Sequence, residues 1–407
     1  METAWNPVQR QTLASWTLLT ETGRGASGCE GGGLVGSRRM ARTIVAALFG
    51  VALVATLIAA AAEAQTKGET CGLPPAATAD ILYDADQAPA RAFAFTYEAE
   101  VPPQPAGVGP IDIFIPLATS DAHQTILRRT VRASIPGRER TESRYGNHFW
   151  HGHLDQSDGK LLTIAVTYLV SRHVFEGQHL ASASGPLSQE DRKELALFLG
   201  PDRLVPVSGL MIDKVRAELP KSDPTPLGRA RAIYDYVIDH MEYKKVGTGW
   251  GNGDTFWACS AHYGNCTDFH ALFISLARAE GIPARFEIGF PIPEDRSSGV
   301  IEGYHCWVEV HLPGVGWFPI DAAEAWKHKE RRDLYFGTYP ADRLQVTIGR
   351  DLELGEGHTT GPLNYFIYPH VEVAGQQLER VKTLFRFSEI PEGQLAAKEA
   401  LNERVGP

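Results

Sequence analysis

The sequence lacks the features that define several common classes of protein. Its 39 Lys and Arg residues are outnumbered by 49 Asp and Glu residues, and the net charge of −10 supplies no basic field for phosphates. Glycine (40) and proline (26) make only 66 of the 407 residues, which excludes a collagen-like chain. We therefore expect a folded protein of roughly two to three domains, at about 150 residues per domain, with no nucleic acid partner.

Several chemical motifs are also absent. There is no Gly-x-Ser-x-Gly turn for a serine nucleophile and no Gly-x-x-x-x-Gly-Lys loop for phosphates. The chain has only five cysteines, and none of them forms the paired Cys-x-x-Cys motifs that make structural zinc sites specific. These absences disfavour a serine hydrolase, a nucleotide-phosphate site and a structural zinc domain.

Residues 40–64 have the pattern of a secretory signal peptide. Arg42 precedes an apolar run over 44–62, and Ala62-Glu63-Ala64 forms a small-x-small cleavage pattern. We expect cleavage before Gln65 and a periplasmic or secreted mature protein. The alternative is a signal anchor, because about 19 apolar residues could span a bilayer, and membrane contact is expected only in that case.

The rest of the chain divides by composition and pattern. Stretches rich in β-branched and aromatic residues at 93–97, 111–115 and 162–168, separated by turn-rich intervals, predict antiparallel sheet. The expected segments are an over-long gene start that is not translated (1–39), a linker (65–90), a β-sandwich domain (91–185), an α+β domain (186–390) and a tail (391–407).

Three histidines, His148, His151 and His153, flank Trp150 in the predicted β-sandwich. Imidazoles at this spacing could bind a metal ion, but alternation along a strand at a sheet edge explains them without one. We therefore expect no metal site.

Two helices are predicted before the chemically informative part of the chain, one over 189–199 and one that begins after Thr225. Thr225 can cap the second helix, and Pro226 can occupy its first turn. Apolar residues then recur at helical spacing over 230–241, which predicts one buried face. The Gly-rich stretch 247–254 ends this pattern.

Cys266 is predicted to lie at the N-terminus of the next helix. Asn265 is a favourable N-cap and Asp268 follows three residues later, as in a capping box, while Gly281 and Pro283 end the helix. The unpaired amides and the positive end of the helix dipole favour a thiolate there, and the amides can hold an oxyanion. Cys266 is therefore a candidate nucleophile if a base lies nearby.

A base is available in a predicted hairpin. Residues 304–312 and 317–321 are predicted to be strands joined by a turn that starts at Pro313. His305 and Asp321 each lie eight residues from Pro313, so they should sit at about the same level on neighbouring strands. With Cys266 they would form the Cys-His-Asp arrangement of nucleophilic acyl transfer, in which the carboxylate orients the imidazole.

Four segments of the sequence resemble the signature series of the transglutaminase-like superfamily, in its bacterial exported branch. In the family's order and spacing, they are Gly264-Asn265-Cys266-Thr267-Asp268, Arg278-Ala279-Glu280-Gly281-Ile282-Pro283-Ala284-Arg285, His305-Cys306-Trp307-Val308-Glu309 and Gly316-Trp317-Phe318-Pro319-Ile320-Asp321. The resemblance is strong over 225–350. It implies a papain-like α+β transglutaminase core in the catalytic domain, preceded by an N-terminal β-sandwich module, with Cys266 as nucleophile, His305 as base and acid, and Asp321 as orienting carboxylate.

The resemblance also implies a reaction. The enzyme would attack an amide carbonyl of a peptide, a protein or a cell-wall peptide and form a thioester, with no metal or organic cofactor. Family members often place an aromatic residue near the oxyanion, and Trp250 or Trp257 could do so here. We expect water to complete the reaction, as in a cysteine peptidase or amidase, because amine transfer needs an apolar tunnel. Cross-linking to amines and a non-catalytic binding or scaffolding module are the alternatives.

The cysteines allow two further arrangements. Zinc accepts ligands of the kind found in Cys259, His262, Cys266 and His270, with His305 and Cys306 later in the chain. In an oxidising compartment, Cys259 and Cys306 could instead form a disulfide that braces the site, and two small buried thiols are the alternative.

Overall fold

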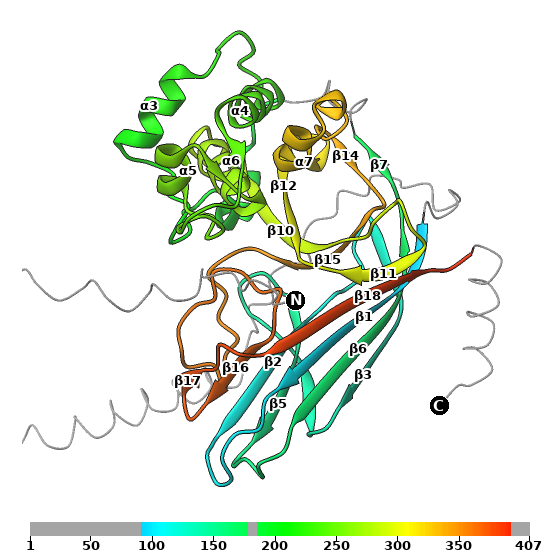
Figure 1. Ribbon diagram of the computed structural model, residues 1–407. Coiled ribbons are helices and arrows are strands. Elements are labelled where there is room, and N and C mark those ends of the chain that lie inside the picture. Colours follow the sequence, from blue (N-terminus) through cyan, green and yellow to red (C-terminus); the bar gives the residue numbers. More distant parts are fainter. Residues whose placement is uncertain (1–90, 178–184, 392–407) are drawn as a thin grey trace, which may run out of the picture. The chain divides into compact units, whose positions relative to one another are not determined.

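The structure is a computed structural model, and it describes residues 91–177 and 185–391 (Figure 1). All of these residues fall within one compact unit of the chain. The gene start, signal peptide and linker expected before residue 91, and the tail, lie outside the described residues, so they stay predictions. Within the described ranges, no helix is both long enough and apolar enough to cross a membrane.

Two antiparallel sheets of five strands each form one part of this unit. The first sheet has the strand order β11 (Ser298–Ile301), β18 (Lys382–Glu389), β1 (Arg91–Val101), β6 (Leu162–Arg172) and β3 (Gln124–Ala133). The second has the order β17 (Gln376–Gln377), β16 (His370–Val373), β2 (Ile111–Leu117), β5 (His148–Leu154) and β4 (Gly137–Thr141).

Alternating side chains bring these two sheets to a common core. Along β1, Phe93, Phe95 and Tyr97 are buried, whereas the residues between them are half-buried, as expected for a strand with one inward face. The three aromatic residues belong to the same hydrophobic cluster as Ile113 and Ile115 of β2. The predicted antiparallel strands near 93–97, 111–115 and 162–168 are therefore confirmed.

The last strands of the chain join these two sheets. β18 pairs with β1 along almost its whole length, and Figure 1 shows β18, in red, beside β1. β16 pairs with β2, so that His370 is opposite Phe114. We expected residues 91–185 and 186–390 to form separate domains. The strand pairing differs from this division, because residues 370–389 belong to sheets whose central strands come from 91–172.

A third, four-stranded antiparallel sheet is packed against helices. Its strand order is β13 (Gly316–Ile320), β12 (His305–Leu312), β10 (Ala284–Pro291) and β15 (Arg343–Ile348). The helices are α2 (Gln189–Glu194), α3 (Leu210–Glu218), α4 (Pro226–His240), α5 (Thr255–Ala261), α6 (Cys266–Ala279) and α7 (Ala322–Lys327), with the short 3₁₀ turns η3 (Ala196–Phe198) and η4 (Lys329–Arg331). Two small strand pairs are β7 (Phe175–Glu176) with β14 (Thr338–Tyr339), and β8 (Glu242–Tyr243) with β9 (Tyr263–Gly264).

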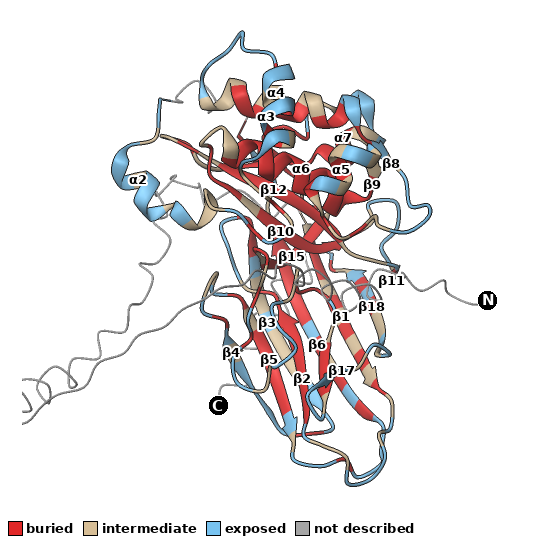
Figure 2. Cartoon of the chain, turned by 90° about the vertical axis from the view of Figure 1, so that its left-hand side faces the viewer, coloured by how far each residue is buried: buried red, intermediate tan, exposed pale blue. Residues whose placement is uncertain are grey.

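Helix α6 lies at the centre of this part. It contacts β10 and β12 on one side and α4 and α5 on the other. Thirteen of its 14 residues are buried, and Figure 2 shows it in red beneath the exposed faces of the outer helices. A helix buried all round fixes the position of its first residue, Cys266, more firmly than a surface helix would.

The two other predicted helices differ in outcome. α4 begins at Pro226, and Thr225 Oγ1 accepts a hydrogen bond from the Gly228 N–H at 3.1 Å, so this prediction is confirmed. The continuous helix predicted over 189–199 is wrong, because α2 ends at Glu194 and a 3₁₀ turn follows. None of the residues of α2 or η3 is buried, so little apolar burial stabilises a longer helix.

Candidate active site

The start of α6 is built by a capping box, as predicted. The Asn265 side chain accepts a hydrogen bond from the Thr267 N–H at 3.0 Å, and Asp268 accepts one from the Asn265 N–H at 2.9 Å. Asp268 also accepts from the N–H groups of Gly251 (2.7 Å) and Gly253 (3.0 Å). One buried carboxylate therefore holds both the helix start and the Gly-rich loop before it.

Cys266 and His305 are both buried, and each shifts the pKa of the other. Burial opposes ionisation of the thiol, but the contacts with Cys306 and His305 hold the pKa of Cys266 well below its usual value. Burial also opposes protonation of the imidazole, but Asp321 and Cys266 raise the pKa of His305 to about 10. These opposite shifts favour a thiolate and an imidazolium over a neutral thiol and a neutral imidazole.

Asp321 lies on the far side of this imidazole. Its Oδ2 atom is 2.7 Å from His305 Nε2, which leaves Nδ1 as the ring nitrogen for Cys266. The predicted hairpin is confirmed, and Val308 pairs with Ile320, so His305 and Asp321 are offset by two residues from exact alignment. An offset of two residues keeps both side chains on the same face of the sheet, where diagonal neighbours still reach one another.

The Asp321 carboxylate has further partners besides His305, and the Glu324 N–H and Arg343 are the nearest of them. Asp321 directly follows β13 and caps α7, because its Oδ1 atom accepts a hydrogen bond from the Glu324 N–H at 3.0 Å. Arg343 Nη1 lies 3.1 Å from Asp321 Oδ2, and the guanidinium lies 4.8 Å from the centre of the Trp307 ring. Burial would raise the pKa of Asp321, but His305 and Arg343 hold it well below its usual value. No motif pointed to Arg343, which follows Asp321 by 22 residues on another strand.

A second thiol and a second imidazole lie beside the pair. Cys306 Sγ is 3.5 Å from His270 Nδ1, and Cys306 lowers the pKa of the Cys266 thiol. Cys259, Cys266 and Cys306 are all free thiols, so the predicted disulfide between Cys259 and Cys306 was wrong. The reason is that Cys306 packs against α6, where Cys266 and His270 are its neighbours.

The zinc set built from Cys259, His262, Cys266 and His270 is not brought together. In the described ranges, the ligand atoms that converge closely enough for a metal ion come from two groups that contain no cysteine. His262 has a left-handed conformation (φ 58°) at the end of α5, and strand β9 separates it from Cys266 at the start of α6.

The indole N–H groups of the two tryptophans predicted to lie near the oxyanion donate to backbone carbonyls instead. The indole N–H of Trp250 donates to the Gly247 carbonyl (3.2 Å), and that of Trp257 donates to the Tyr263 carbonyl (3.1 Å). Neither donor is free in this conformation. The Cys266 N–H, at the first position of α6, has no intrahelical acceptor and is the better placed donor.

These side chains therefore stand in series: a thiolate at a helix start, an imidazolium on the adjacent strand and a carboxylate held by an arginine. This is the class of site in which a cysteine serves as nucleophile and a histidine as acid and base. The family comparison agrees with that class. The model of the transglutaminase-like superfamily matches residues 213–322, a range that contains Cys266, His305 and Asp321, so this part of the chain is similar to that superfamily.

Similarity to individual proteins is weaker. An uncharacterized protein of Haemophilus influenzae (strain ATCC 51907 / DSM 11121 / KW20 / Rd) is 30% identical over an alignment of 188 residues. The match covers 38% of this chain, and the chain spans about half (51%) of that relative. A crystal structure of a candidate cysteine protease from Cytophaga hutchinsonii is 18% identical, with 74% of this chain and 98% of that chain covered and a TM-score of 0.48. The periplasmic domain of TgpA from Pseudomonas aeruginosa is also 18% identical, with coverage of 60% and 91% and a TM-score of 0.27.

Proposed function

We propose that the protein is an exported cysteine enzyme that cleaves an amide bond through a thioester on Cys266. The observation that carries this proposal is the series of interactions through His305, with Cys266 through their mutual pKa shifts and with Asp321 at 2.7 Å. Export rests on the signal pattern at 40–64. In this proposal, residues 91–177 with the strands at 370–389 form a β-sandwich beside the transglutaminase-like core.

The proposed reaction has two halves. The Cys266 thiolate attacks the amide carbonyl, and the N–H groups at the start of α6 stabilise the oxyanion. The C–N bond then breaks as the His305 imidazolium protonates the leaving amine, which yields a thioester and a neutral imidazole. His305 next removes a proton from water, hydroxide attacks the thioester, and the carboxylic acid leaves as Cys266 recovers its thiolate and His305 its proton.

Water is proposed as the second nucleophile because the tryptophans available for an aromatic tunnel have other partners. Trp307 is buried beneath the site, and its N–H donates to Glu287 at 2.6 Å. Trp317 stacks on the Arg285 guanidinium at 4.3 Å. Trp250 and Trp257 donate to carbonyls as described above. Exclusion of water from the thioester would need an apolar channel, and the contacts of these four indoles already fix their orientation.

The test is amide profiling of the purified mature protein. Glutamine-containing peptides and cell-wall peptides would be supplied with and without a primary amine, and release of ammonia or of a new amino terminus would be followed separately from amine incorporation. We expect hydrolysis by the wild type, a thioester adduct detectable by mass spectrometry, and neither with Cys266→Ala. Cys259→Ala, which removes a half-buried thiol of α5, is the matched control and should keep full activity.

Three results would contradict the proposal. Full activity of Cys266→Ala would refute the nucleophile. Amine incorporation in excess of hydrolysis at low millimolar amine would make the protein a cross-linking enzyme. No product with any peptide, together with tight binding of one of them, would favour a binding module.

A further inference from the structure

Imidazole and carboxylate side chains gather on one face of the second sheet, far from Cys266 in the sequence. Strands β16, β2 and β5 are neighbours there, and the register aligns His370, Phe114 and His151 in one row and Glu372, Asp112 and His153 in the next. Residues two apart on a strand share a face, so all six point to the same side. We call these six residues the histidine face. Five of its six positions carry a group that can bind a metal ion.

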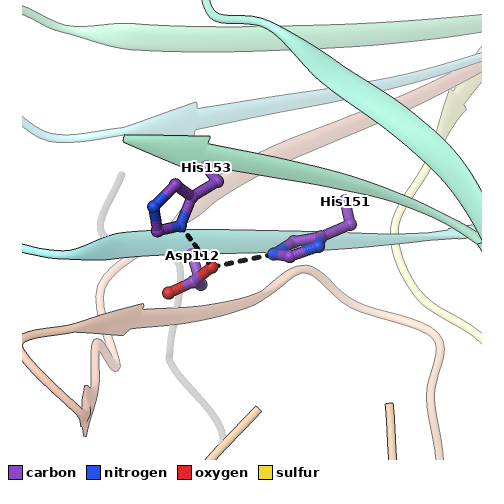
Figure 3. A group of neighbouring side chains, drawn as sticks. All are labelled: Asp112, His151 and His153. Atoms are coloured by element: carbon purple, nitrogen blue, oxygen red, sulfur yellow. Dashed lines mark hydrogen bonds and ion pairs between the residues drawn. The ribbon is translucent and has the colours of Figure 1, made fainter. Parts of the chain in front are cut away.

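Within the histidine face, two imidazoles converge on one carboxylate oxygen (Figure 3). His151 Nε2 and His153 Nδ1 each lie 2.8 Å from Asp112 Oδ1. Ligand atoms of the three residues all lie within 4.8 Å of one another. Asp112 and His151 are buried, whereas the side chain of His153 is 48% exposed, so the group is open to solvent on one side only.

The surroundings hold this group in place. The ring of Phe114 is stacked on that of His151, with centroids 4.5 Å apart and an angle of 4° between the planes. Gly357, in a left-handed conformation (φ 84°), passes directly over the group. A Cβ atom at Gly357 would lie 2.5 Å from Asp112 Oδ1 and 3.0 Å from His151 Nε2, so any other residue there would fill the space beside the three ligands.

We propose that Asp112, His151 and His153 bind a divalent transition-metal ion, with Zn²⁺ as the ion that suits this donor set. Two imidazole nitrogens and one carboxylate oxygen are ligands that Zn²⁺ prefers, whereas Mg²⁺ and Ca²⁺ prefer oxygen alone. Three protein ligands leave a fourth position for water on the open side of His153. This proposal differs from the expectation of no metal, because the sequence did not bring Asp112 to the histidines, and it does not rest on the proposed enzymatic function.

Arg140 contacts one of the proposed ligands, His151, and opposes binding of the ion. Its Nη1 atom lies 3.0 Å from His151 Nδ1, and because a guanidinium only donates, His151 carries its proton on Nε2 when no ion is bound. An ion on Nε2 displaces that proton to Nδ1, so Arg140 must release its contact there. Arg140 already donates to the Glu356 carbonyl at 2.8 Å and can keep this partner. Arg140 therefore competes with the ion, and its removal should tighten binding.

The neighbouring group of His358, His370 and Glu372 fits an ion less well. Glu372 accepts hydrogen bonds from the backbone N–H and side-chain hydroxyl of both Thr359 and Thr360. His370 Nε2 is 3.0 Å from Glu372 Oε1 and 3.1 Å from Thr360 Oγ1. The oxygen atoms of Glu372 and the Nε2 atom of His370 are thus occupied, whereas His358 Nε2 has no hydrogen-bond partner within the described part of the chain. Two of the three ligands would have to give up their present partners, and His370 serves as a control residue.

The experiment is calorimetric titration of Zn²⁺ into the metal-free mature protein. The Cys266→Ala variant is used, because the Cys266 thiolate would itself bind Zn²⁺. We expect one ion per chain, binding that is roughly tenfold or more weaker in His151→Ala and in His153→Ala, and tighter binding in Arg140→Gln. His148→Ala is the matched control: it lies on the same strand, faces the other side and pairs with Glu139 at 2.6 Å.

The outcomes separate the proposal from its rivals. Circular dichroism of each variant confirms that it is folded, and Asp112→Asn provides a second, isosteric test of the same ligand set. Absence of Zn²⁺ binding would overturn the proposal, as would unchanged binding in the His151→Ala/His153→Ala double variant. Loss of binding in His370→Ala with His151→Ala unaffected would also overturn it and move the ion to the neighbouring group. Equal binding of Mg²⁺ would refute the choice of ion.

Discussion

Cys306 Sγ lies 3.5 Å from His270 Nδ1, so a second thiol and a second imidazole stand next to Cys266. Burial lowers the pKa of His270 to about 4, and this imidazole is neutral at neutral pH. Burial together with the neighbouring Cys266 raises the pKa of Cys306 well above its usual value, so this thiol keeps its proton. The site therefore contains one ionised and one protonated thiol in contact.

The first prediction concerns this second thiol. Cys306 lowers the pKa of the Cys266 thiol, so Cys306→Ala should raise the pKa of Cys266, and Cys306→Ser, which keeps a donor, should restore it. The rate of alkylation by iodoacetamide as a function of pH measures this pKa. Cys259→Ala should leave the profile unchanged. An unchanged profile in Cys306→Ala would assign the low pKa of Cys266 to His305 and the helix start alone.

The second prediction concerns Arg343, a positioning residue that acts through Asp321. Its replacement by Met removes one charged hydrogen bond to the carboxylate, a contribution of about 1.5–3 kcal/mol. If that energy orients the imidazole in the transition state, kcat should fall roughly ten- to a hundredfold with little change in KM. Arg386→Met, which breaks an exposed pair with Glu98, is the control and should have no effect on kcat. A purely structural role would lower stability and leave kcat of the folded protein unchanged.

The third prediction follows from the raised pKa of His305. Activity should persist through neutral pH and decline as the pH rises through about 10, where the imidazolium is lost. The free energy of unfolding should change in the same direction. His305 stabilises the folded protein fully below its unfolded pKa of about 6.5, and this stabilisation disappears as the pH rises through 10. In Asp321→Asn the upper limb of the kcat/KM profile should move toward 6.5. If it stayed near 10, Asp321 would not be the partner that raises this pKa.

The fourth prediction tests whether β18 is integral to the first sheet. The Phe385 ring lies 4.8 Å from that of Tyr97 on β1 and 4.4 Å from that of Phe290 on β10. Phe385→Ala should therefore lower the free energy of unfolding by about 3–5 kcal/mol in urea denaturation. Phe256→Ala, on a ring that is 50% exposed, should change it by about 0.5 kcal/mol or less. Equal effects of the two substitutions would mean that the C-terminal strands are peripheral.

Local patterns in the sequence predicted the site better than they predicted the sheets. The start of α6 could be predicted because Asn265, Cys266 and Asp268 are close in the chain, and the hairpin of His305 and Asp321 is also local. Arg343 and Asp112 could not be found, since each meets its partners only through pairing between distant strands. The pairing of residues 370–389 with the first two sheets could not be predicted for the same reason. The local sequence of a strand does not determine which other strand it pairs with.

The fifth prediction concerns Asp268, which accepts hydrogen bonds from three buried backbone N–H groups. Asp268→Ala leaves these donors without an acceptor, at about 1–3 kcal/mol each, so the protein should lose about 3 kcal/mol or more of stability, and the Gly-rich loop should lose its anchor. Asp191→Ala is the matched control, because Asp191 holds the same capping-box position in the exposed helix α2, where the expected loss is about 0.5–1 kcal/mol.

The pH dependence of that loss provides a second measurement. Burial raises the pKa of Asp268 to about 6, although its three hydrogen bonds oppose the rise. A folded-state pKa above the unfolded value of about 3.9 means that the folded protein gains stability from proton uptake at low pH and loses this gain as the pH rises through 6. The difference in unfolding free energy between the wild type and Asp268→Ala should therefore narrow between pH 4 and pH 7. A difference that widened over this range would show that the carboxylate is stabilised in its ionised form, with the backbone N–H groups outweighing the cost of burial.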